Sequence, residues 1–151
     1  MTSPEITQII SGFIGSLCFG ILFNMRGKKL AASACGSLLS WMLFVLLSHI
    51  LQSEPIIYFI VAAIISLYSE IMARIIKTPA TPLITTSLIP LIPGGSLYYT
   101  MAYAFESDLD RFIEKAVYTL QLASSLAIGI IFITTLFMLV FRKKASSGQK
   151  S

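Results

Sequence analysis

One carboxylate and one guanidinium group lie four residues apart inside an apolar part of the sequence. Glu70 and Arg74 share one face of the helix that residues 56–76 predict, so their side chains are expected to form an ion pair. Counted from Ile56, Glu70 lies about 21 Å along that helix, inside the hydrocarbon core but near one boundary. A titratable group at that depth can couple proton movement to transport, which makes both residues candidate coupling residues. The alternative is an interfacial ion pair that only anchors the end of the helix.

A second group of residues interrupts an apolar stretch, "SLIPLIPGGSLYYTM", at residues 87–101. Pro90 and Pro93 have no backbone N–H, so the carbonyl groups of Thr86 and Ile89 lose their usual helical donors. Lipid cannot satisfy such groups, and irregular backbone at membrane depth is tolerated only against protein or a water-filled cavity. The sequence therefore predicts a helix break that serves a function, with a passive proline kink as the alternative.

The residues after the prolines predict a new helix start that can bind an anion. Gly94 and Gly95 permit a sharp turn, and Ser96 is expected to cap a second half-helix. The N-terminal end of such a half-helix carries partial positive charge, and secondary transporters use it to bind carboxylates near the middle of the membrane. The candidate substrate-binding residues are Thr86, Pro90, Pro93, Gly94, Gly95, Ser96 and Tyr99.

The amino-acid composition indicates that these residues belong to a membrane protein. Of the 151 residues, 56% are hydrophobic and 12% are charged, and the mean hydropathy of +0.83 excludes an ordinary soluble domain. We predict an all-α integral membrane protein with about five transmembrane helices, the fourth broken at the Pro/Gly-rich element, in a single membrane domain, residues 1–151. The predicted helices cover residues 5–24, 30–51, 56–76, 82–102 and 107–141.

The last predicted helix begins outside the membrane. Ser107 and Asp110 resemble a capping box, and a helix over residues 107–141 would be about 50 Å long, which exceeds the bilayer core. Its first turns are therefore expected to project beyond the outer surface or to tilt.

Charge indicates how the chain crosses the membrane. Five crossings place nine of the eleven basic residues on one side, and the acidic residues of the loops on the other. Basic residues in short loops mark the cytoplasmic side, so we predict an extracellular N-terminus and a basic cytoplasmic tail over residues 142–151. The net charge of +4 then reflects topology, and nucleic-acid binding is not expected. The nine residues are Arg26, Lys28, Lys29, Arg74, Lys77, Arg142, Lys143, Lys144 and Lys150.

Small residues recur every four positions in the first two helices, a spacing that lets helix backbones approach closely in lipid. Packing within the bundle and a subunit interface are both compatible with these stripes. Their members are Gly12, Ser16, Gly20, Ala32, Gly36 and Ser40.

The sequence carries no recognisable catalytic or metal-binding pattern. The sequence has one histidine, no cysteine pair at ligand spacing, no phosphate-binding glycine loop and no nucleophile elbow. We therefore expect no enzyme activity, no metal and no cofactor. A transporter subunit and a scaffold subunit that stabilises a partner remain, and the helix break favours the transporter because a scaffold has no need for bare backbone at membrane depth.

The segments "IPLIPGGSLYYTM" and "SLYSEIMARIIKTPAT" resemble the threonine/serine exporter family, in the C-terminal membrane half that also occurs as a separate small subunit. The resemblance runs from the first apolar segment through the last, and its pattern includes Glu70 and Arg74. It implies an inner (plasma) membrane exporter assembled from two unlike halves, with threonine, serine or, in the YjjB-like subunits, succinate as cargo. The implied partner is a longer membrane subunit that resembles the N-terminal half of the family and carries a soluble region. A homo-oligomer in the lipid bilayer is the alternative assembly.

Overall fold

The computed structural model describes residues 3–147, with the side chains of residues 7–140, and every regular element in that range is helical. The side chains of the predicted basic tail, residues 142–151, lie outside the described residues. The elements are α1 (Ser3–Leu22), α2 (Lys28–Ser48), α3 (Glu54–Ile76), α4 (Ala80–Leu88), the short 3-10 helix η1 (Ile89–Leu91), α5 (Gly94–Phe105) and α6 (Leu109–Ser147).

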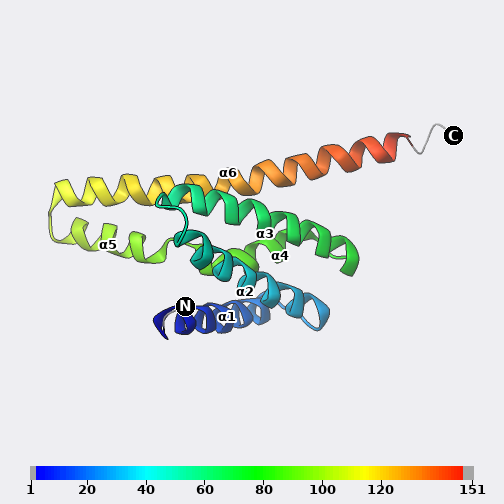
Figure 1. Ribbon diagram of the computed structural model, residues 1–151, viewed down its shortest axis with the longest axis horizontal. Helices are drawn as coiled ribbons and strands as arrows, with labels where there is room; N and C mark the ends of the chain where they lie inside the picture. The colour runs from blue at the N-terminus through cyan, green and yellow to red at the C-terminus, as the bar shows by residue number, and fades with distance from the viewer. Residues whose placement is uncertain (1–2, 148–151) are drawn as a thin grey trace.

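The helices form an antiparallel bundle with one projecting hairpin. Along the long axis of the molecule, α1, α3 and α6 run one way, whereas α2 and the α4–α5 segment run the other way (Figure 1). The longest element, α6, packs mainly on α3 and α5, while α2 lies against α1, α3 and α4. The outer half of α5 and the start of α6 extend beyond the first residue of α3 (Figure 1).

Three helices within the described range are long and apolar enough to cross a membrane. They are Lys28–Ser48, Glu54–Ile76 and Leu109–Val140, and the apolar segments Thr7–Leu22 and Ala80–Leu91 are shorter. The all-helical class and the apolar helices agree with the prediction from composition, whereas the number of five crossings stays a prediction.

The predicted break is present. The α-helix ends at Leu88, one turn of 3-10 helix follows, Ile92 is extended with φ −61° and ψ 126°, and α5 begins at Gly94. The carbonyl of Ile89 is not bare, because it accepts the Ile92 N–H at 3.1 Å. The 3-10 turn thus gives the Ile89 carbonyl a backbone donor, although a regular α-helix could not supply one because of Pro93.

The start of α6 differs from the predicted capping box. Ser107 has a positive φ of 58° and lies in the turn, and it is the Asp108 carboxylate that accepts the Arg111 N–H, at 3.2 Å. The predicted capping box is wrong because α6 begins at Leu109, so Asp108 and not Ser107 occupies the N-cap position. The Asp108 carboxylate accepts the backbone N–H there, as the Ser107 hydroxyl was expected to do.

Small side chains hold the first four helices close together. Gly36 on α2 faces Ser87 on α4, and a Cβ at Gly36 would lie 2.2 Å from the Ser87 Oγ. The Ser33 hydroxyl donates to the Thr86 hydroxyl across the same α2–α4 contact. On α1, Gly12 packs beside the Pro90 ring. The small-residue stripes are thus used, at these positions, for packing inside the chain.

Candidate transport site

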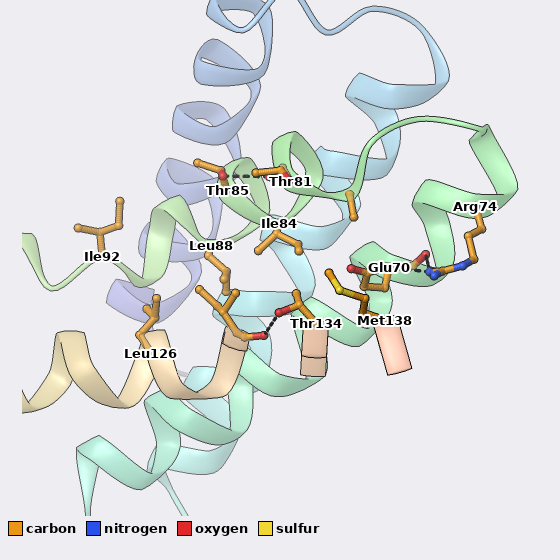
Figure 2. Close-up of a pocket in the computed structure, with 12 residues that line it drawn as sticks. Glu70, Arg74, Thr81, Ile84, Thr85, Leu88, Ile92, Leu126, Thr134 and Met138 are labelled. Carbon is orange, nitrogen blue, oxygen red and sulfur yellow. Dashed lines mark hydrogen bonds and ion pairs between the residues drawn. The ribbon is translucent and has the colours of Figure 1, made fainter. Parts of the chain in front are cut away.

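A pocket between α3, α4 and α6 lies on one side of the helix break. Its volume is about 630 Å³, and we call it the Glu70 pocket (Figure 2). Most of its wall is aliphatic, with the charged pair at one end. The lining residues are Glu70, Arg74, Ala80, Thr81, Ile84, Thr85, Leu88, Ile92, Leu126, Ile130, Thr134 and Met138.

The two candidate coupling residues are joined at the end of this pocket. Arg74 Nη1 donates to Glu70 Oε2 at 2.8 Å and to the Glu70 carbonyl at 3.0 Å, as the four-residue spacing predicts (Figure 2). The Arg74 guanidinium also lies 4.5 Å from the centre of the Phe137 ring on α6. The Glu70 side chain is only 15% exposed, so the carboxylate is largely enclosed by the wall.

Two hydroxyl groups that line the Glu70 pocket donate hydrogen bonds to carbonyl groups of their own helices. Thr85 donates to the Thr81 carbonyl at 2.9 Å, and Thr134 donates to the Ile130 carbonyl at 2.9 Å. Each hydroxyl oxygen keeps a lone pair that can accept a hydrogen bond from a substrate.

The Glu70 pocket lacks a wall on one side. Ile92 is 58% exposed and Met138 is 70% exposed, although both line the pocket. The groove is therefore open toward lipid or toward another protein.

A second pocket lies on the other side of the break, between α3, α5 and α6. Its volume is about 420 Å³, and we call it the Lys115 pocket. It is the more polar of the two, because charged, hydroxyl and phenol groups make up most of its wall. The lining residues are Glu54, Tyr58, Pro93, Gly95, Ser96, Tyr99, Lys115, Tyr118 and Leu122.

The N-terminal end of α5 faces the Lys115 pocket. Gly95 and Ser96 line it in the first turn of α5, which begins after Pro93 without a side-chain cap. Ser96 was expected to be that cap, but its hydroxyl is hydrogen-bonded to Thr119 of α6 at 2.6 Å. Thr119 also lies 3.2 Å from the Thr100 hydroxyl, so three hydroxyl groups tie α5 to α6 here.

Glu54 and Lys115 bring opposite charges to the wall of the same pocket. The Tyr118 hydroxyl donates to the Glu54 carboxylate, and the Lys115 ammonium lies 5.7 Å from the centre of the Tyr118 ring. Neither Glu54 nor Lys115 forms an ion pair with another described side chain. Both charges are therefore available to a ligand.

The break separates the two pockets. Ile92 lines the Glu70 pocket, whereas the next residue, Pro93, lines the Lys115 pocket. On α6 the same boundary falls between Leu126 and Leu122, which are one helical turn apart. We call these four residues the partition.

The structure divides the candidate substrate-binding residues between the Lys115 pocket and three other places. Pro93, Gly95, Ser96 and Tyr99 line the Lys115 pocket. The remaining three candidates line neither pocket: Thr86, Pro90 and Gly94.

Each of those three has a different setting. Thr86 is fully buried and donates to the Pro82 carbonyl at 2.7 Å, which places it in the α2–α4 packing. Pro90 lies against Gly12 of α1. Gly94 is at the first turn of α5, with open space around the position of a Cβ.

Four residues that line the Lys115 pocket were not predicted from the sequence: Glu54, Tyr58, Lys115 and Tyr118. One signal was present, because Arg111 and Lys115 are the two basic residues that the charge pattern places on the acidic side of the membrane. Arg111 is accounted for by its contact with Asp108 at 3.4 Å. Lys115 has no such acidic partner among the described side chains, and its pocket explains its position.

Comparison with known proteins identifies the family. The family described as "Threonine/Serine exporter, ThrE" matches residues 8–136, which include the Lys115 pocket, the partition and all of the Glu70 pocket except Met138. No curated protein matches the chain, and no solved structure matches it. Because the family match covers most of the sequence, the chain belongs to the threonine/serine exporter family of membrane transporters.

Proposed function

We propose that this protein is the small membrane subunit of a two-component exporter, a secondary transporter of threonine/serine exporter type. Its cargo is a small carboxylate-bearing metabolite, which is threonine, serine or a dicarboxylate such as succinate. The cargo moves between the Glu70 pocket and the Lys115 pocket across the partition.

The arrangement of the pockets at the break carries this proposal. Both pockets lie along α3 and α6, and the partition between them is formed by Ile92, Pro93, Leu122 and Leu126. Leu122 is 2% exposed and is the buried member of this boundary, so we assign it the role of the barrier in this conformation. A transporter needs one closed barrier between two accessible cavities, and a small rotation at a broken helix is a common way to move such a barrier.

The need for a second subunit follows from the open side of the Glu70 pocket. Glu70 and Arg74 are at membrane depth, and polar groups there need protein or water around them. Ile92 and Met138 at the edge of the pocket are more than half exposed. A longer membrane subunit that resembles the N-terminal half of the family would supply the missing wall, and a second copy of this chain is the alternative.

The proposed setting is the cell (inner or plasma) membrane, with several crossings, an extracellular N-terminus and a cytoplasmic C-terminus. In this orientation the Glu70 pocket is nearer the cytoplasm and the Lys115 pocket is nearer the outside. Export then runs from the aliphatic pocket with the Glu70–Arg74 pair to the polar pocket at the α5 end.

Reconstitution tests the proposal. The purified chain, the longer subunit and the two together are placed in proteoliposomes loaded with radiolabelled L-threonine, L-serine or succinate. We expect efflux above the empty-vesicle rate only when both subunits are present, because one subunit alone leaves the Glu70 pocket without its second wall.

Two outcomes would contradict the proposal in different ways. Rapid efflux from this chain alone would refute the two-subunit assembly and favour a homo-oligomer. Efflux from the longer subunit alone, at the rate of the pair, would show that this chain is a scaffold subunit.

A further inference from the structure

We infer that the Lys115 pocket is a binding site for a small zwitterion, with Lys115 holding its carboxylate and Glu54 its ammonium group. This inference rests on the proposed function, since it names the chemistry of the cavity at one end of the proposed route. It assigns roles to three residues that the sequence motifs did not include: Glu54, Tyr58 and Lys115.

The carboxylate end of the ligand is recognised by several donors at once. Lys115 lines the pocket without an acidic partner among the described side chains, and the first turn of α5 presents Gly95 and Ser96 to the same space. Neither the Gly95 N–H nor the Ser96 N–H donates to an acceptor among the described residues. An ammonium group beside the N-terminal end of a helix forms a strong site for one carboxylate.

A buried phenol supplies an independent indication of a ligand. Tyr58 is only 8% exposed and lines the pocket, yet its hydroxyl has no hydrogen-bond partner among the described residues. Its ring is held in place by an edge contact with Phe44, with ring centres 5.5 Å apart. The hydroxyl oxygen itself stays accessible, so a polar ligand in the pocket can form a hydrogen bond with it.

Glu54 holds the ammonium end of the ligand. It belongs to the same pocket as Lys115 but does not pair with it, and among the described residues its carboxylate accepts a hydrogen bond from the Tyr118 hydroxyl. A carboxylate with spare acceptor sites binds an ammonium group and repels a second carboxylate. The pocket therefore favours a free amino acid over a dicarboxylate of similar size.

Binding to the full-length chain in lipid nanodiscs tests the site apart from transport. Radiolabelled L-threonine is the probe, with unlabelled L-threonine or succinate as competitor, and the measurement is repeated on the complex with the longer subunit. We expect saturable binding of the probe, and we expect unlabelled L-threonine to displace it at a concentration at least tenfold lower than succinate. Lys115→Met should weaken L-threonine binding about tenfold or more, and Lys115→Arg should retain part of it.

The Glu54 variant gives the sharper result. Glu54→Gln should weaken competition by L-threonine about tenfold and should strengthen competition by succinate, because the repulsion of a second carboxylate is gone. Tyr58→Phe should weaken binding several-fold while it keeps the ring contact with Phe44. Arg111→Met and Glu114→Gln are matched controls on α6 outside the pocket, and both should bind as the wild type does.

The results separate this site from the transport proposal. Binding that depends on Lys115 and Glu54, without efflux from the complex, would support the site and count against transport. Efflux that is insensitive to both substitutions would support transport and overturn the site. No saturable binding to the wild type, alone or in the complex, or stronger competition by succinate than by L-threonine, would also overturn it.

Discussion

Ile92 and Pro93 are neighbours in the chain, yet they line different pockets: Ile92 faces the cavity that contains Glu70, and Pro93 faces the cavity that contains Lys115. Their peptide unit lies between a 3-10 turn and the first residue of α5, where no regular helix fixes its direction. A change in backbone dihedral angles at this one place would alter both cavities together. The broken helix therefore links the shapes of the two cavities.

Filling the Lys115 pocket should block transport without unfolding the protein. Gly95 lines that pocket and has open space around the position of a Cβ, so Gly95→Leu would place its side chain in the cavity. We expect efflux from the reconstituted two-subunit complex to fall about tenfold or more, with normal expression and membrane insertion.

The neighbouring glycine provides the control for that experiment. Gly94 also has open space but does not line either pocket, so Gly94→Leu should transport at close to the wild-type rate. Equal loss in both variants would indicate that the turn itself, and not the cavity, requires small residues.

Removal of the Glu70 charge tests coupling. Glu70→Gln keeps the shape of the side chain but cannot exchange a proton, so efflux driven by a pH gradient should fall while assembly with the longer subunit is unchanged. If the pair with Arg74 only anchors the end of α3, the substitution should cost about 1 kcal/mol or less and leave transport near normal. The pH dependence of efflux from proteoliposomes distinguishes these roles, and an unchanged profile would rule out coupling through Glu70.

Close packing of α2 on α4 should be sensitive to a single methyl group. Gly36→Ala would place a Cβ 2.2 Å from the Ser87 Oγ and 2.9 Å from the Ser87 Cβ. Rotation of the hydroxyl can relieve only the first contact, so the helices must separate, at a cost of about 1–3 kcal/mol. Gly15→Ala on α1 meets nothing within 4 Å. It should be neutral, or stabilising by up to about 1 kcal/mol through helix propensity. Circular dichroism during denaturant unfolding in detergent measures both, and equal stability of the two variants would contradict the packing described here.

The predicted topology can be read by labelling single cysteines. In a background with Cys18→Ser and Cys35→Ser, the positions Ser53, Ser107 and Ser147 are each changed to cysteine. An impermeant maleimide applied to intact cells should label the first two and spare the third, because basic loops stay in the cytoplasm. Labelling at position 147 but not at position 53 would show that the orientation is the opposite of the predicted one.

The sequence alone determined the features that depend on neighbours along the chain. Apolar runs of sufficient length indicated membrane helices, two prolines and two glycines within six residues indicated the break, and a four-residue spacing indicated the Glu70–Arg74 pair. Each of these follows from local geometry, since helix length, a missing N–H group and the turn of a helix do not depend on distant residues.

Only the tertiary structure decided which faces of the helices meet. Thr86 and Ser96 are ten residues apart, yet Thr86 is sealed against α2 while Ser96 opens into the Lys115 pocket. Lys115 and Glu54 are brought to that pocket from α6 and α3, which are distant in the sequence. The periodicity of a membrane helix cannot give this information, because its lipid-facing side and its packed side are both apolar. Contacts between small residues fix the helix faces, and through them they fix which polar groups share a cavity.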